Sequence, residues 1–591
     1  MERKSLLRDT KLSIKDMIEG IVEVYPGLSG SPEHGITFLN KYRGNKTAIL
    51  TGGGSGHEPF PIGYIADNML TGSVSGPIFT SPSTSHIFSA ISILSKLNKG
   101  GVLVAVLNYT GDQLNFGLAI ERAKAKGIDV EKISISDDVA LLGTDMAAII
   151  GNRGILGCAF IFKLLGAMSE EEKSLNDLKI VYNDISKRVA SMGACLVPCR
   201  IPGCSDLLFS LKDDEVSLGC GVHGEAGIST IPMGKVEVMV GQVLNKIFES
   251  EVVRAGDRAC VLIGNLGTLT QIESFIVARA AKMLIEKKDI IIERLYVGTF
   301  MSSLDMKGFQ ISMMNVNQRD NWVHYLDTPT SAFGWPGTLY SYMSQKPVAQ
   351  SLTRIESGEE QLEGPKLTDK ESNIFKTAVI AACNAIRDNK EKINELDSGC
   401  GDGDCGTTMG YFAEGVLARK DSLPWKWVGS CLMHLSKIAE DEMGGTSGAV
   451  YSLLLAGAAR GVTISWQEGW TAALQTLYTH SPARVGHRTL IDALAPACET
   501  YSSCIVSGKN NWKLCLKQAV MAAKTGCHNT STMKAKVGRA AYAAPTRLKD
   551  FDAGAFAVTV WLQAVYLSLE KKTRRNQQNI TFLFSNKSAL V

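Results

Sequence analysis

Three aspartates, Asp397, Asp402 and Asp404, lie close together in the glycine-rich sequence of residues 396–408. Carboxylates at this spacing repel one another unless a cation lies between them, and Mg²⁺ prefers oxygen ligands from carboxylates and phosphates. The next residues, 405–408, offer backbone N–H groups and hydroxyls that could bind phosphate oxygens. The segment lacks the bidentate glutamate that closes an EF-hand calcium loop. The residues alone leave two possibilities, a Mg²⁺–nucleotide site or an acidic surface turn.

A second group of polar residues lies in three glycine-framed loops of the first half of the chain. His57 ends a glycine run that follows a predicted strand and lacks both the P-loop lysine and the spacing of a dinucleotide-binding loop. Asp112 follows another predicted strand, where α/β proteins often keep a catalytic base. His223 lies between glycines that leave its ring open to a ligand. Each residue alone could belong to a tight turn, but three such loops in one half of the chain favour a site.

Two kinds of element must position these residues. In the first half, short apolar runs at residues 47–50, 101–107 and 259–263 end in Gly, Asn or Asp and precede helix-like segments. This pattern predicts an α/β domain of buried strands alternating with helices, at residues 9–342. A polar stretch, residues 343–371, predicts a linker.

The second half shows only helical periodicity, which predicts an all-α bundle at residues 372–570 whose helices are joined by glycine-bearing loops. A basic and then weakly apolar tail follows at residues 571–591. The predicted helices cover residues 374–396, 425–443, 466–477, 490–501, 512–525 and 554–569.

The composition argues against several classes of protein. It is 45% hydrophobic and 20% charged, and its formal net charge of +3 is too near zero to indicate binding to nucleic acid or to an anionic membrane. The N-terminus has no apolar signal-peptide core, and the most apolar long stretch, residues 147–168, contains Arg153 and Lys163. The 14 cysteines lack paired metal-ligand spacing, so we expect reduced and mostly buried thiols. A cytoplasmic protein that acts on small molecules is therefore expected.

With these residues assembled, the chain resembles the dihydroxyacetone kinase family, in particular its fused, ATP-dependent triokinase/FMN cyclase branch. The resemblance covers roughly residues 10–340 and 372–569. The matching motifs lie, in chain order, at residues 53–59, 108–117, 223–227, 297–301, 401–407, 444–449 and 538–542.

The resemblance implies a kinase whose α/β half binds a short-chain ketone or aldehyde, such as dihydroxyacetone or glyceraldehyde. In the family, the histidine that matches His223 adds to the substrate carbonyl as a covalent hemiaminal, which fixes the terminal hydroxyl for transfer. The match implies that Asp112 takes the proton from that hydroxyl and that His57 hydrogen-bonds the substrate. The implied pocket lining is Gly54, Ser55 and Gly56.

For the helical half, the resemblance implies a site for ATP as co-substrate with Mg²⁺, held by Asp397, Asp402 and Asp404. Residues 538–542 resemble the family's mobile cover over ATP. Animal relatives also split FAD into AMP and cyclic FMN at this site, where Mn²⁺ is possible, and a homodimer is expected from the family. The implied nucleotide contacts are Cys405, Gly406, Thr407, Thr408, Thr446, Ser447, Thr489, Leu490, Asp552, Ala553 and Gly554.

Several positions depart from the family pattern. Leu107 stands where relatives usually carry a lysine near the substrate, and the loss of that donor could cost on the order of 1.5–3 kcal/mol in substrate binding or transition-state stabilisation. His487, Lys534 and Lys536 also differ from the family near the nucleotide. These departures leave open a family member that has weakened into a ligand-binding or regulatory protein. A subunit that takes phosphate from a protein donor is a further alternative, against which the fusion of both halves argues.

Overall fold

The computed structural model describes residues 6–7, 10–143, 151–204, 206–337, 366–398, 403–507, 511–537 and 550–575. The chain forms two compact units, Met1–Ala349 and Gln350–Val591. Residues 343–365 of the predicted linker lie outside the described residues, so the predicted domain boundaries stay predictions.

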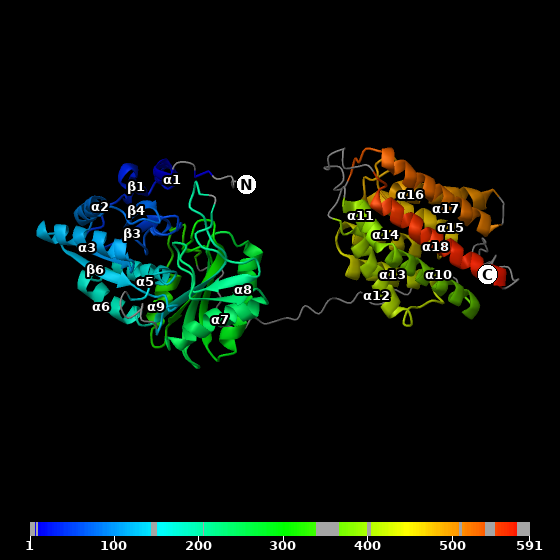
Figure 1. The fold of residues 1–591 in the computed structure, drawn as a ribbon. Helices are drawn as coiled ribbons and strands as arrows, with labels where there is room; N and C mark the ends of the chain where they lie inside the picture. The colour runs from blue at the N-terminus through cyan, green and yellow to red at the C-terminus, as the bar shows by residue number, and fades with distance from the viewer. Residues whose placement is uncertain are drawn as a thin grey trace. The chain divides into compact units, whose positions relative to one another are not determined.

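The first unit contains two six-stranded sheets of mixed direction (Figure 1). In the first sheet, β3, β4, β5 and β6 run parallel, and β1 and β2 extend it with antiparallel pairing. In the second sheet only β10 and β11 pair in parallel. The first sheet has the order β1 (Leu28–Ser31), β2 (Ile36–Leu39), β4 (Gly72–Ile78), β3 (Ala48–Ser55), β5 (Val102–Leu107) and β6 (Val130–Ile135). The second has the order β11 (Ile291–Gly298), β10 (Arg258–Asn265), β12 (Lys307–Asn315), β7 (Val189–Val197), β8 (Glu215–Leu218) and β9 (Ser229–Pro232).

Helices cover these sheets, and one helix lies deep in the unit. The buried residues of α5 join side chains of both sheets in one apolar cluster, and every residue from Cys158 to Ser169 is buried. Lys163 in this helix donates from Nζ to the Tyr325 carbonyl at 2.8 Å. The apolar stretch that begins near residue 147 therefore includes a core helix. The helices of the unit are α1 (Thr10–Val24), α2 (Thr84–Leu97), α3 (Thr110–Ala125), α5 (Cys158–Glu170), α6 (Leu175–Ile185), α7 (Val236–Glu249), α8 (Gln271–Glu286) and α9 (Asp320–Asp327).

The second unit consists of helices (Figure 1), and the contacts between them close into a ring. Each of α12 to α17 packs against the next helix along the chain, α18 packs against α10, and α10 packs against α12. Short connections make most of these neighbours antiparallel, so the N-termini of alternate helices meet at one end of the ring. The helices are α10 (Asp369–Asp388), α11 (Lys390–Ser398), α12 (Cys405–Arg419), α13 (Val428–Met443), α14 (Gly445–Gly461), α15 (Trp466–His480), α16 (Ile491–Val506), α17 (Trp512–Asn529) and α18 (Ala553–Arg575).

Two features of the ring bear on expectations from the sequence. Among the described residues, only α18 is apolar and long enough, over Ala553–Lys571, to cross a membrane by length and composition, and as a member of the ring it packs against α10, α16 and α17. A disulfide between Cys504 and Cys515 joins α16 to α17. The expectation that all thiols are reduced is therefore wrong for this pair, whereas most of the described free cysteines are buried as expected.

The α/β and all-helical halves are confirmed, but the helix prediction missed α12 and α14. Both helices are rich in glycine, which indicated loops. Their glycines instead let neighbouring backbones approach closely. A Cβ on Gly406 of α12 would lie 2.1 Å from the Lys390 carbonyl oxygen, and one on Gly461 of α14 would lie 2.3 Å from that of Glu468. The predicted helix at residues 374–396 is two helices, α10 and α11, that meet near Asn389.

Candidate active site

The glycine run at the end of β3 brings a second loop against His57. A Cβ on Gly54 would lie 2.6 Å from the Thr80 backbone nitrogen, so glycine is needed for this approach. Gly56 has φ of 99°, which favours glycine as well. The contact places the Phe79 ring in a stack on the His57 ring, with centroids 4.9 Å apart. Ser55 donates its hydroxyl to the Gly76 carbonyl at 2.7 Å, so it holds the two strands together.

The protonation state of His57 follows from its hydrogen bonding. Its Nδ1 lies 2.9 Å from the Ser302 carbonyl, which can only accept, so Nδ1 carries the hydrogen. The Ser302 N–H in turn donates to the His57 carbonyl at 3.0 Å. Burial, and then the nearby His223, lower the pKa of His57 to about 3. The ring is therefore neutral at physiological pH, and Nε2 is a hydrogen-bond acceptor.

His223 lies in the loop between β8 and β9 of the second sheet, yet it contacts residues of the first. Its ring meets the rings of His57, Phe79 and Tyr109 edge to face, at centroid distances of 4.7, 5.5 and 4.5 Å. The side chain keeps 22% of its surface exposed. Aromatic walls on three sides hold the ring in one orientation, while its open side can meet a ligand.

Asp112 completes the predicted group from the first turn of α3. It is only 5% exposed. Burial raises the pKa of Asp112 to about 6, although the Ser81 hydroxyl and His223 favour the ionised form. Within the described part of the chain, Asp112 Oδ1 and His57 Nε2 are both buried without a hydrogen-bond partner. Buried polar atoms are nearly always paired, so these two indicate a missing polar ligand.

Two charged residues at this site were not singled out from the sequence. Glu225 accepts a hydrogen bond from the His223 backbone N–H at 2.9 Å, and its Oε1 lies 3.4 Å from His223 Nδ1. Arg153 lies in the loop before α5 and pairs with the buried Asp138. Glu225 is within the motif of residues 223–227, so the sequence offered a signal for it. Arg153 is far from the motifs in sequence, and only the fold brings it here.

Leu107, at the end of β5, belongs to the buried apolar cluster and is 3% exposed. Its side chain lies against Gly154, since a Cβ on that glycine would be 3.0 Å from Leu107 Cδ2. The position at which relatives usually carry a lysine therefore contributes an apolar wall next to the segment that bears Arg153.

In the second unit, Asp397 lies near the end of α11, and its side chain reaches the N-terminus of α12. Its Oδ2 accepts hydrogen bonds from the backbone N–H groups of Gly403, Asp404 and Cys405, at 3.0, 3.2 and 3.3 Å. A carboxylate is stabilised there by the partial positive charge of the helix end. Asn394 binds the backbone and the hydroxyl of Thr407, both at 3.0 Å. The predicted metal loop is thus tied to α11.

The predicted nucleotide contacts lie at the N-termini of alternate ring helices. They open α12 at residues 405–408, α14 at 446–447 and α18 at 553–554, and residues 489–490 directly precede α16. Helix N-termini are favourable binding positions for phosphate oxygens. The common direction of these helices brings the contacts to one end of the ring. The structure therefore groups residues that are more than a hundred positions apart in the sequence.

Carboxylates gather at the same end of the ring. Burial raises the pKa of Asp552 to about 6, and the negative charges of Asp492 and Asp397 act in the same direction. Asp492 accepts hydrogen bonds from the N–H groups of Gly486, at 2.5 Å, and Thr489, at 2.8 Å. These oxygen donors beside phosphate-binding helix ends fit Mg²⁺ with a nucleotide. No group of three potential metal ligands occurs within the described residues, and Asp402 and the predicted cover at 538–542 lie outside them.

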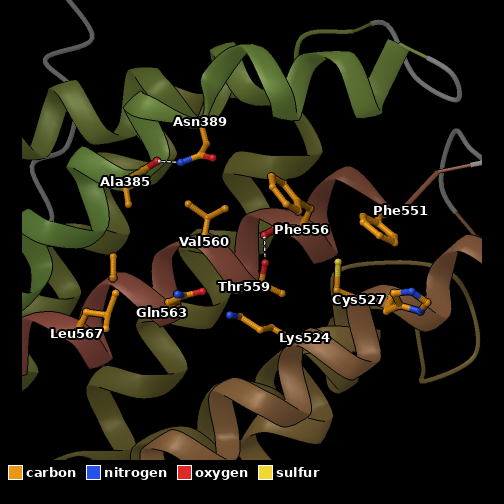
Figure 2. Close-up of a pocket in the computed structure, with 12 residues that line it drawn as sticks. Ala385, Asn389, Lys524, Cys527, Phe551, Phe556, Thr559, Val560, Gln563 and Leu567 are labelled. Carbon is orange, nitrogen blue, oxygen red and sulfur yellow. Dashed lines mark hydrogen bonds between the residues drawn. The ribbon is translucent and has the colours of Figure 1, made fainter. Parts of the chain in front are cut away.

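A separate hollow of about 540 Å³ lies along α18, between α10 and α17 (Figure 2). Its walls are mostly apolar, with Phe556, Val560 and Leu567 on one side of α18, and Lys524 extends toward it from α17. None of the residues predicted to bind metal or nucleotide lines it. The hollow is therefore distinct from the predicted nucleotide site.

Comparisons with known proteins match both units. Residues 19–334 match the Dak1 domain and residues 399–567 the DAK2 domain. The chain is 33% identical over 582 residues to the Homo sapiens protein named triokinase/FMN cyclase, with 96% of this chain and 99% of that protein covered. It is 34% identical over 597 residues to a putative 3,4-dihydroxy-2-butanone kinase of Solanum lycopersicum, with 97% and 99% covered.

Among solved structures, the dihydroxyacetone kinase from C. freundii in complex with AMP-PNP and Mg²⁺ matches with a TM-score of 0.68 and 26% identity. This match covers 96% of the present chain and 100% of the other. Domain content, order and full-length similarity agree, and the chain therefore belongs to the dihydroxyacetone kinase family.

Proposed function

We propose that this protein is an ATP-dependent kinase that phosphorylates dihydroxyacetone and glyceraldehyde. The observation that carries the proposal is the pair of buried polar atoms, His57 Nε2 and Asp112 Oδ1, that have no partner among the described residues and lie beside the partly exposed His223. A small molecule that carries hydroxyls and a carbonyl supplies what each of these atoms lacks. The names of several relatives, triokinase/FMN cyclase and dihydroxyacetone kinase, support the same substrates.

In the proposed reaction, His223 adds through a ring nitrogen to the substrate carbonyl carbon. The C=O π pair moves to oxygen, which takes up a proton, and a hemiaminal results. The neutral His57 accepts a hydrogen bond at Nε2 from a substrate hydroxyl. Asp112 takes the proton from the hydroxyl that is to be phosphorylated, a role that requires its ionised form. The adduct fixes that hydroxyl and so lowers the entropic cost of transfer.

ATP and Mg²⁺ are proposed to bind at the helical unit. Asp397 and Asp404, together with Asp402, would hold the metal, and the helix N-termini would bind the phosphates. Bound Mg²⁺ offsets negative charge on the phosphoryl group during transfer. The solved complex of a relative with AMP-PNP and Mg²⁺ supports this assignment.

The same metal–nucleotide site is proposed to cleave FAD into AMP and cyclic FMN, with Mn²⁺ as an alternative metal. The support is the name FMN cyclase carried by four similar animal proteins. We further propose a cytoplasmic homodimer with no nucleic-acid or membrane partner. Light scattering of the purified protein measures the oligomeric state, and a monomer at micromolar concentration would contradict the dimer.

The kinase proposal is tested by ADP release from purified protein with ATP and Mg²⁺, with and without dihydroxyacetone. Release should require both Mg²⁺ and the triose, and glycerol should not replace the triose because an alcohol has no carbonyl to form the adduct. His223→Ala should abolish triose-dependent release but leave ATP binding intact. Full activity in this variant would refute the hemiaminal.

A catalytically weakened, ligand-binding member of the family is the second candidate, which the apolar Leu107 favours. It predicts that the protein binds ATP and triose but turns over neither triose nor FAD.

A further inference from the structure

Glu225 contacts His223 at both its backbone and its ring. One carboxylate oxygen accepts the His223 backbone N–H at 2.9 Å, and the other lies 3.4 Å from Nδ1 of the ring. Burial raises the pKa of Glu225, but contact with His223 and the charge of Arg153 outweigh that effect and hold the pKa at about 2. Glu225 is therefore ionised at physiological pH. An ionised carboxylate can only accept, so it favours a hydrogen on Nδ1 and leaves Nε2 with a free electron pair.

Arg153 is placed to hold this carboxylate. Its Nε and Nη2 donate to Oδ2 of the buried Asp138 at 2.7 and 2.6 Å, and Nη2 also donates to the Gly219 carbonyl at 2.8 Å. The remaining nitrogen, Nη1, points to Gly221: a Cβ on this glycine would lie 2.8 Å from Nη1 and 2.1 Å from Glu225 Oε2. Arg153 thus links the loop after β6 to the loop that bears His223, and its charge faces Glu225.

We infer that Glu225 and Arg153 are positioning residues for His223, Glu225 by binding Nδ1 so that Nε2 attacks the substrate carbonyl, and Arg153 by fixing Glu225. This inference rests on the proposed kinase function and extends it to two residues that would act through His223. It also accounts for Gly221, because any side chain there would displace the Glu225 carboxylate.

The electrons and protons of the step show why a carboxylate is useful here. Nε2 supplies the electron pair of the new C–N bond, the C=O π pair moves to oxygen, and that oxygen takes up a proton from water, which leaves hydroxide in the solvent. The ring, still protonated at Nδ1, then carries a positive charge. Glu225 offsets this charge, so it stabilises the adduct more than the free histidine. The edge-to-face contact with Tyr109 prevents the ring from turning away from Glu225.

The test measures the adduct directly. Full-length protein is mixed with dihydroxyacetone labelled with ¹³C at the carbonyl carbon, whose NMR signal moves to the tetrahedral region when the hemiaminal forms. Glu225→Gln keeps the size of the side chain and removes its charge. We expect its adduct equilibrium constant and its kcat/KM for triose-dependent ADP release to fall by about 10- to 100-fold, because a charge-assisted hydrogen bond is lost. Arg153→Lys, which keeps the charge but not the fork of donors, should lose less.

Glu215→Gln is the matched control. Glu215 begins the neighbouring strand β8, where it pairs with Lys212 at 2.9 Å and does not contact His223. The Glu215→Gln variant should therefore form as much adduct as the wild type. An adduct in Glu225→Gln within twofold of the wild-type level overturns the inference, as does an equal loss in Glu215→Gln. Absence of adduct in the wild-type protein instead overturns the proposed hemiaminal itself. Protein labelled with ¹⁵N-histidine, measured without dihydroxyacetone, reports the tautomer of His223, which should shift from Nδ1–H in the wild type to a mixture in Glu225→Gln.

Discussion

Burial of the Asp112 carboxylate should lower the folding stability of the protein, although the proposed reaction needs this residue as a base. Its carboxyl is 5% exposed, and burial raises its pKa from the ordinary 3.8 to about 6. This difference corresponds to about 3 kcal/mol of folding free energy lost at neutral pH, because the folded state disfavours the charge that the unfolded chain carries freely. Asp112→Asn keeps the shape, can still bind Ser81 and removes the charge. We therefore expect the variant to unfold at a temperature about 4 °C higher at pH 7.

The stability difference between the wild type and Asp112→Asn should depend on pH in one direction. Because the folded-state pKa is raised, the wild-type penalty is fully present above about pH 6 and disappears below the unfolded value of 3.8. The gain in Asp112→Asn should shrink accordingly between pH 6 and pH 4. Calorimetric or denaturant unfolding of both full-length proteins at pH 7, 6, 5 and 4 measures it.

The same substitution tests the catalytic role of Asp112. It should lower triose-dependent ADP release by about 10²–10⁴-fold if Asp112 is the base. Wild-type kcat/KM should also fall as the pH drops through about 6. A variant that is less stable than the wild type at pH 7 would refute the argument from burial, and one that keeps full activity would refute the role as base.

Three further experiments probe other parts of the chain. Asp397→Asn should abolish Mg²⁺-dependent ATP binding, measured by calorimetry, and both the kinase and the lyase reactions, measured by product release. Loss of the kinase reaction alone would argue against one metal site shared by both reactions. Leu107→Lys should raise kcat/KM for dihydroxyacetone by about tenfold, because it restores a charged hydrogen-bond donor. Leu107→Met is the control. An unchanged kcat/KM in Leu107→Lys would show that Leu107 does not limit substrate binding. Gly461→Ala should lower the unfolding temperature although alanine favours helices, because the new Cβ would lie 2.3 Å from the Glu468 carbonyl. Gly410→Ala, whose Cβ would meet only Lys390 Cδ at 3.7 Å, should raise it, and equal effects of the two glycine substitutions would contradict the packing argument.

Local sequence patterns predicted the type of each half of the chain. Apolar runs such as residues 101–107 are buried on both sides in β5, and helical periodicity alone identified six segments of the ring. The pattern failed for α12 and α14, because a glycine in a turn and a glycine at a close helix contact look alike in one sequence. The distinction depends on the neighbouring backbone, such as the Lys390 carbonyl that lies against Gly406.

For the site, the sequence by itself determined which side chains could do chemistry: His57, Asp112 and His223 in glycine-framed loops, and the aspartates before α12. Motif residues carry their chemistry and their local loop with them, so they can be recognised without a fold. Only the tertiary structure decided that the ring of His57, after β3 of the first sheet, meets the ring of His223, in the loop between β8 and β9 of the second, with centroids 4.7 Å apart. It also decided that Asp112 is buried. Desolvation of a carboxyl depends on the residues that the fold packs around it, and the sequence next to Asp112 does not reveal them.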